Sequence, residues 1–102
     1  MKPYRFVEEA DSEFFEWIAH YDRVSRDLGD RFVAAIERAV VNVRTFPQIG
    51  ATHGKKLRKL EITEFPCRLL YANEPEEIVI IAIAPHKRRP GYWRKRLRHL
   101  RR

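Results

Sequence analysis

Two neighbouring segments in the second half of the chain read Phe65-Pro66-Cys67-Arg68-Leu69-Leu70-Tyr71 and Ile78-Val79-Ile80-Ile81-Ala82-Ile83-Ala84, with the polar turn 73–76 between them. The second segment is apolar without alternation, which indicates a strand buried on both faces in the interior of a sheet. It runs directly into Pro85-His86-Lys87-Arg88-Arg89-Pro90-Gly91-Tyr92-Trp93-Arg94-Lys95-Arg96. We therefore expect the last strand to deliver positive charge and aromatic rings to one edge of the sheet.

A strand before these two segments extends the same sheet. Over residues 57–62, Leu60 and Ile62 share one face of the predicted strand. The connections between the three strands are too short for a crossover, so the sequence predicts an antiparallel meander. A short first strand at 4–7 joins this sheet, and 47–56 reads as a loop because of its glycines.

Two amphipathic helices lie between the first strand and the meander. Apolar residues recur at helical spacing in both halves of 10–46, and neither helix is stable without a surface to cover. The rings expected in the core are those of Phe14, Trp17, Phe32 and Phe46. The predicted boundaries are a cap at Asp11 or Ser12, an end near Asp27, a break at Gly29, a stop at Pro47 and a basic terminal helix over 91–100.

The predicted element order is β-α-α-β-β-β with a terminal helix. This is an α+β fold in which a helical hairpin packs on one face of a twisted antiparallel sheet. The length of 102 residues fits one domain over 1–102.

Positive charge is concentrated in the second half of the chain. Residues 1–46 hold 7 Lys/Arg and 9 Asp/Glu, a net charge of −2, and residues 47–102 hold 14 Lys/Arg and 5 Asp/Glu, a net charge of +9. Such asymmetry favours an anionic partner: nucleic acid, an anionic membrane or an acidic protein. Solubility is the simpler interpretation of the same charge.

The sequence also indicates a compartment. The single Cys67 has no partner for an internal disulfide, and no cluster of Cys and His surrounds it, so neither a metal nor a cofactor is expected. No apolar run approaches the ~20 residues needed to cross a bilayer. The first residues lack the apolar stretch of a secretory signal. We expect a reduced, cytoplasmic setting with no membrane partner.

The chain resembles the RelE/ParE superfamily of toxins from type II toxin–antitoxin systems. The helical region carries Leu28-Gly29-x-x-Phe32 and closes on Phe46-Pro47, and the next strand opens with Leu57-Arg58-Lys59. The two most specific pieces are the strand 65–71 and the ending from His86 to Arg96, which contains Arg89, Tyr92 and Trp93. That ending is similar to the ParE-type, plasmid-stabilisation subgroup in particular.

The resemblance implies a toxin held inactive by a cognate antitoxin with an acidic C-terminal segment, in a toxin–antitoxin hetero-oligomer. ParE-type toxins inhibit DNA gyrase by protein contact, whereas RelE-type toxins are metal-independent mRNA interferases that act on the ribosome. For the gyrase inhibitor, no catalytic residue is expected and the target-binding residues are Arg68, Arg89, Tyr92, Trp93, Arg94, Arg96 and Arg98. For the nuclease, the catalytic residues are Lys59, Arg68, His86, Lys87 and Arg89. A third interpretation is a domain that only stabilises a partner.

Two departures from the RelE pattern favour the gyrase inhibitor. Lys59 and Arg68 match RelE cations, but Glu61 falls where a second lysine would lie. A carboxylate there opposes the charge stabilisation that phosphoryl chemistry needs. Trp93 stands where a tyrosine would be, and an indole cannot exchange a phenolic proton. His86 leaves a variant acid–base mechanism open.

The same residues also have purely structural interpretations. Arg68 is placed to pair with Glu61 or Glu64 across a hairpin, and His86 to cap or pack at the strand end. The two adjacent rings at 92–93 suit an anchor for the last helix. Cys67 reads as an inert strand residue. The cations that read equally well as a solvated tail are Arg94, Lys95, Arg96, Arg98, Arg101 and Arg102.

Overall fold

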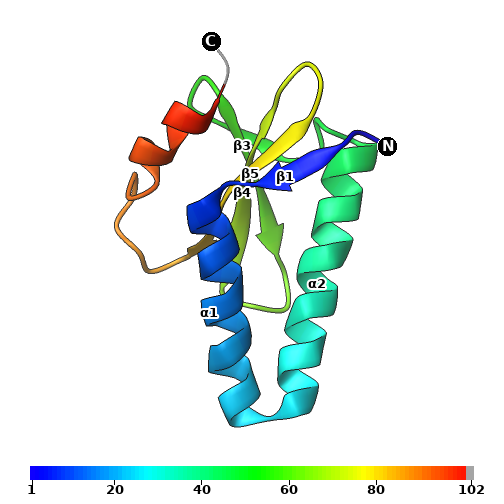
Figure 1. Cartoon of the computed structure of the whole chain (residues 1–102), viewed down its shortest axis with the longest axis vertical. Coiled ribbons are helices and arrows are strands. Elements are labelled where there is room, and N and C mark those ends of the chain that lie inside the picture. Colours follow the sequence, from blue (N-terminus) through cyan, green and yellow to red (C-terminus); the bar gives the residue numbers. More distant parts are fainter. Residues whose placement is uncertain (101–102) are drawn as a thin grey trace.

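Residues 1–100 are described by a computed structural model in which a helical hairpin lies against one face of a five-stranded sheet (Figure 1). The helices are α1 (Glu8–Val24) and α2 (Arg26–Thr45), followed at the end of the chain by the short 3-10 helix η1 (Arg94–His99). The strands are β1 (Tyr4–Phe6), β2 (Ala51–His53), β3 (Leu57–Ile62), β4 (Cys67–Asn73) and β5 (Ile78–Pro85). The predicted α+β fold is confirmed. Within residues 1–100, no helix is both long and apolar enough to cross a membrane.

The sheet has the order β1-β5-β4-β3-β2 and is mixed rather than entirely antiparallel. The four later strands form the predicted antiparallel meander, but β1 runs parallel to β5, with Tyr4 opposite Ile78. The backbone N–H of Val7 continues this pairing by donating to the carbonyl of Ile80 at 3.0 Å, and α1 begins at the next residue. The prediction of a loop over 47–56 was incomplete, because β2 is an edge strand too short to show a periodic pattern.

The interior position predicted for the apolar run 78–84 is confirmed. β5 lies between β1 and β4, and each of its residues from Ile78 to Ala84 is buried. The hairpin covers one face of this strand and its neighbours, with α1 packed against β5 and α2 against β3.

The predicted boundary between the two helices was wrong by several residues. α1 begins at Glu8, before the predicted caps, and ends at Val24. Ser25 then serves both helices, because its N–H donates to the carbonyl of Tyr21 and its hydroxyl accepts from the N–H of Leu28. Gly29 lies buried inside α2 instead of breaking the chain. A Cβ at Gly29 would come within 1.7 Å of the Asp22 carboxylate, so this glycine permits close contact between the helices.

The core contains three of the four predicted rings. Phe32 is fully buried, and Phe14 and Trp17 pack partly buried against the core, but Phe46 is 62% exposed. Phe46 is the C-cap residue of α2, where the chain leaves the helix and turns towards β2. Tyr71 fills the space under this turn, and its hydroxyl donates to the Pro47 carbonyl and accepts from the N–H of Gly50.

The segment after β5 forms turns and η1 rather than the predicted α-helix over 91–100. Gly91 has a φ of +81°, a backbone conformation that favours glycine, and the next turns close with bonds to the third residue back. Four of the six residues of η1 are Lys or Arg and none is acidic, so neighbouring like charges oppose a longer helix. The tail prediction for Arg101 and Arg102 lies outside the described residues.

Candidate functional site

A carboxylate stands among the cations on the exposed part of the sheet. Glu61 on β3 lies directly opposite Arg68 on β4, and its two oxygens lie 2.9 Å from Arg68 Nε and 2.9 Å from His86 Nε2. The contact with Arg68 is a close approach of opposite charges rather than an aligned hydrogen bond. The structural interpretation of Arg68, a cross-strand pair with Glu61, therefore describes the observed contact.

His53 and Lys59 extend this cluster towards the sheet edge. His53 on β2 is half-buried beneath Trp93, with ring centroids 5.4 Å apart. Burial lowers the pKa of His53, and the nearby charges of Lys59 and Arg68 lower it further. His53 therefore favours its neutral form. The sequence pattern does not single out His53, because 47–56 reads as a loop.

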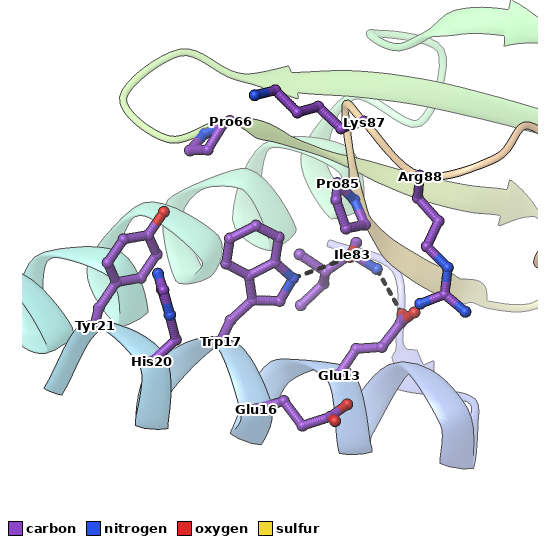
Figure 2. A pocket seen from close by; sticks show the side chains of 10 residues that line it. All are labelled: Glu13, Glu16, Trp17, His20, Tyr21, Pro66, Ile83, Pro85, Lys87 and Arg88. Atoms are coloured by element: carbon purple, nitrogen blue, oxygen red, sulfur yellow. Dashed lines mark hydrogen bonds between the residues drawn. The ribbon is translucent and has the colours of Figure 1, made fainter. Parts of the chain in front are cut away.

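The other two nuclease candidates lie elsewhere. Lys87 lines an open hollow of about 670 Å³ beside α1, together with Arg88, Trp17 and Tyr21 (Figure 2). Arg89 is exposed in the turn that follows and forms no ion pair within residues 1–100. Glu61 thus links Arg68 with His86. Lys59 and Arg68 both lie near His53, whereas Lys87 lies in the hollow beside α1.

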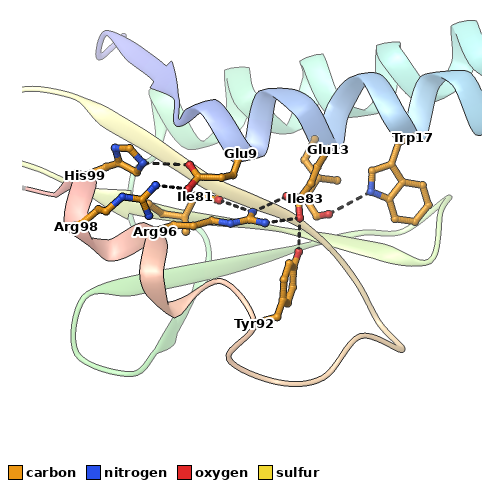
Figure 3. Close-up of polar contacts among 9 residues, drawn as sticks. All are labelled: Glu9, Glu13, Trp17, Ile81, Ile83, Tyr92, Arg96, Arg98 and His99. Carbon is orange, nitrogen blue, oxygen red and sulfur yellow. Dashed lines mark hydrogen bonds and ion pairs between the residues drawn. The ribbon is translucent and has the colours of Figure 1, made fainter.

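The basic segment after β5 is fastened to α1 by one carboxylate. Glu13 accepts two hydrogen bonds from the Arg96 guanidinium, at 2.8 and 2.9 Å, and one from the Tyr92 hydroxyl at 2.8 Å (Figure 3). It also accepts from the backbone N–H of Ile83 at 3.1 Å. The side chains of Glu13 and Arg96 are each only 12% exposed. We call Glu13, Tyr92 and Arg96 the clamp.

Electrostatic contacts around the clamp hold the neighbouring side chains. The guanidiniums of Arg88 and Arg96 lie 4.3 and 5.0 Å from the centre of the Tyr92 ring. Burial raises the pKa of Tyr92 above its ordinary range, and the hydrogen bond to Glu13 raises it further. The phenol therefore remains protonated and can serve as a donor to Glu13.

A second carboxylate, one turn earlier on α1, holds the end of the segment. Glu9 pairs with Arg98 and with His99, the latter at 3.1 Å (Figure 3). The hydrogen bond from Arg98 is the main cause that lowers the pKa of Glu9 to about 2. Arg5 completes the attachment by donating to the His99 carbonyl at 2.9 Å.

These contacts divide the predicted target-binding residues into two groups. Arg68, Tyr92, Arg96 and Arg98 are engaged with carboxylates of the chain itself, and Trp93 packs over His53. In the stretch that follows β5, four exposed cations form neither an ion pair nor a contact with an aromatic ring within residues 1–100, and we call them the free cations: Lys87, Arg89, Arg94 and Lys95. Sequence patterns could not make this division, because nothing in the local sequence connects Glu9 and Glu13 with the residues that follow β5.

An apolar groove lies at the other side of the hairpin. It has a volume of about 410 Å³ and runs between β1 and the two helices. Phe6 and Phe14 stack in it at 5.8 Å, and the guanidinium of Arg44 lies 4.7 Å from the Tyr4 ring at its rim. The other lining residues are Ile36, Glu37, Val40 and Val41. Tyr4 is 44% and Val41 45% exposed, so this groove presents apolar surface to solvent.

Comparisons with known proteins agree with the fold and bear on the function. A sequence model described as the ParE toxin of the type II toxin–antitoxin system parDE matches residues 4–90. No curated protein sequence matches the chain. Among solved structures, the chain is similar to one from the chromosomal ParDE system of P. aeruginosa, with a TM-score of 0.72 and 18% identity over 83% of this chain and 96% of that chain. At this identity, the structural likeness supports the fold alone.

Proposed function

The chain belongs to the ParE toxin family of type II toxin–antitoxin systems, and we propose that it inhibits DNA gyrase by direct protein contact and is neutralised by a cognate antitoxin. The family match confirms the resemblance seen in the sequence. The choice of gyrase over mRNA is the further step, and it is argued from the arrangement of charges on the sheet.

The position of Glu61 is the observation that carries this choice. Metal-independent RNA cleavage needs unopposed cations around the developing phosphorane charge and groups free to move protons. Glu61 instead lies 2.9 Å from Arg68 and 2.9 Å from His86, the two best candidates for those roles. A phosphate at this place would meet a carboxylate and a cation already paired. A toxin that acts by binding has no such requirement.

The free cations supply the surface for such binding. Three of them, Arg89, Arg94 and Lys95, lie on the segment that the clamp fastens beside α1, and all are exposed. Unpaired arginines on a segment that is held by side-chain hydrogen bonds are suited to acidic protein surfaces and to phosphates. Gyrase and the DNA bound to it offer both kinds of group.

A supercoiling assay with purified gyrase, run beside primer extension on translated mRNA, tests the proposal. The wild-type chain is expected to block supercoiling and to leave mRNA intact. The double variant Arg89→Ala/Arg94→Ala is expected to lose about tenfold or more in inhibition, since it removes two exposed contact arginines. Its control is Arg23→Ala/Arg26→Ala, which removes the same charge around the turn between the helices. Unaffected gyrase would overturn the proposal.

A ribosome-dependent endonuclease remains the second candidate. The observation in its favour is that Lys59, Arg68, His53 and His86 still lie together on the sheet. Codon-phased cuts in the primer-extension arm would support it. Those cuts would have to disappear in Lys59→Ala and Arg68→Ala, with Lys87→Ala and Arg89→Ala testing the other two cations.

The antitoxin is proposed to cover the apolar groove between β1 and the helices. Its acidic segment would be drawn by the net charge of +9 on residues 47–102, while exposed apolar surface in the groove supplies contact area. Val41→Glu is expected to weaken antitoxin binding about tenfold or more and to leave gyrase inhibition intact. Val24→Glu, which changes an exposed valine at the end of α1, is the control. Equal antitoxin affinity in both variants would place the interface elsewhere.

A further inference from the structure

The outer edge of β5 is only partly covered by another strand. β1 pairs with Ile78, Val79 and Ile80 and then turns into α1, so within residues 1–100 the edge from Ile81 onward has no strand beside it. Side chains replace the missing strand there. Arg96 donates to the Ile81 carbonyl, Glu13 accepts from the Ile83 N–H, and the Trp17 indole donates to the Ile83 carbonyl at 3.1 Å (Figure 3).

Glu13 is the centre of this arrangement because both of its oxygens are fully used. One oxygen accepts from Arg96 and from the Ile83 backbone, and the other accepts from Arg96 and from the Tyr92 hydroxyl. The parallel pair of hydrogen bonds fixes the plane of the guanidinium as well as its distance. A single carboxylate thereby joins α1, β5 and the terminal basic segment.

The clamp residues and the free cations alternate along the chain. Arg89 precedes Tyr92 by one turn, and Arg94 and Lys95 lie between Tyr92 and Arg96. Fastening Tyr92 and Arg96 to Glu13 therefore holds the backbone on both sides of Arg94 and Lys95. Two other contacts hold the segment: the Trp93 ring packs on His53 within this stretch, and Arg98 and His99 pair with Glu9 beyond it. Neither contact involves the side chains of Tyr92 and Arg96, which Glu13 fastens to α1.

We propose that Glu13 is the positioning residue of the toxin: it touches no target, but it orders the segment 89–96 so that Arg89, Arg94 and Lys95 form one preorganised binding surface. The inference rests on the proposed function only for the identity of the target. Preorganisation raises affinity because the ordering entropy has been lost before the target binds. Loss of the Glu13 charge should therefore reduce toxicity through disorder of the segment while the core remains folded.

The test compares Glu13→Gln with Glu16→Gln, an exposed carboxylate three residues further along α1. Three readouts are taken: trypsin cleavage after Arg94 or Lys95, growth arrest in cells, and gyrase inhibition. Glu13→Gln is expected to speed cleavage in the segment about tenfold or more, to keep the circular dichroism and antitoxin affinity of the wild type, and to weaken growth arrest about tenfold. Glu16→Gln is expected to match the wild type.

The possible outcomes distinguish a failure of the clamp proposal from a failure of the proposed target. Unchanged cleavage in Glu13→Gln would refute the clamp, and faster cleavage with full growth arrest would refute its role in toxicity. Growth arrest by a wild type that leaves gyrase active would refute the proposed target, and the same two variants would still decide the role of Glu13. Should Glu13→Gln not fold, Tyr92→Phe removes one hydrogen bond of the clamp, and a smaller change in cleavage and growth arrest in the same direction is required.

Discussion

At the scale of single residues, burial controls the chemistry of Cys67. Its side chain is fully buried on β4, and burial, aided by the charge of Glu61, raises the pKa of the thiol to about 12. The thiolate is the reactive form of cysteine. Cys67 is therefore neither accessible to reagents nor readily ionised. The sequence-based interpretation of an inert strand residue agrees with this environment.

Cys67 is therefore expected to resist iodoacetamide in the folded chain at mildly alkaline pH, near the ordinary thiol pKa. In urea it should react at the rate of a free cysteine, which provides the control. Mass spectrometry after timed quenching measures the difference. Rapid labelling without urea would contradict the buried environment.

The ion pairs of Glu9 make the attachment of the basic segment to α1 dependent on pH. The pKa of Glu9 is lowered from 4.5 to about 2 in the fold, so its attachment is fully present above 4.5 and is lost as pH falls through about 2. Carboxylate resonances followed by NMR should titrate near 2 for Glu9. Arg98→Ala is expected to move that titration upward towards 4.5, because Arg98 is the main cause of the shift. An unchanged titration in the variant would contradict the ion pair.

Which residue contacts could be predicted depends on their separation in the chain. Arg68 and Glu61 lie on adjacent strands of a short hairpin, so register alone placed them together. Glu13 and Arg96 are 83 residues apart and come together only in the tertiary structure. No spacing rule connects a helix charge to an arginine so distant in sequence, and for this reason the sequence did not predict that Arg96 pairs with Glu13.

At the scale of elements, Ser25 controls the turn between the helices. It is the C-cap residue of α1 and the N-cap residue of α2, with one hydrogen bond in each role. The helices are joined by this single residue, so no other residue is available to cap α2.

Ser25→Ala is expected to lower the free energy of unfolding by about 1 kcal/mol, the usual effect of losing a serine N-cap. Ser12→Ala, at an exposed position inside α1, is the matched control and should change stability by less than about 0.5 kcal/mol. Urea unfolding followed by circular dichroism measures both. Equal stability of the two variants would show that the cap is dispensable.

Element boundaries were predicted well where a pattern was long. The buried run of β5 and the alternation of β3 gave their bounds to within a residue, because both depend on periodic burial. β2 has only three residues, and the direction of β1 in the sheet depends on its pairing with β5. Neither feature can be predicted from the local sequence. The predicted helix break at Gly29 was wrong for a related reason, since this glycine makes room for Asp22 of the other helix.

At the scale of the whole molecule, the two halves of the chain differ in net charge. The helical half carries −2 and the rest carries +9, yet η1 lies beside the acidic start of α1. Part of the positive charge is thus neutralised internally, and the free cations account for what remains near the clamp.

The association rate with the proposed antitoxin is expected to fall steeply as ionic strength rises, since long-range attraction is screened beyond ~10 Å at 0.1 M salt. The dissociation rate should change little, because apolar contact in the groove is less sensitive to salt. Stopped-flow fluorescence at several salt concentrations measures both rates. An association rate independent of salt would show that charge plays no part in the encounter.

The pairing of β1 with β5 also has a temporal meaning. β1 is made before the other strands of the sheet and β5 after them, so during co-translational folding β1 stays unpaired until β5 has left the ribosomal tunnel. The cations that follow β5 emerge after it. Until then, Glu13 lies on a helix whose partner sheet is incomplete. The proposed binding surface is therefore complete only after β5 has been made, and the proposed antitoxin can contact the earlier part of the nascent chain first.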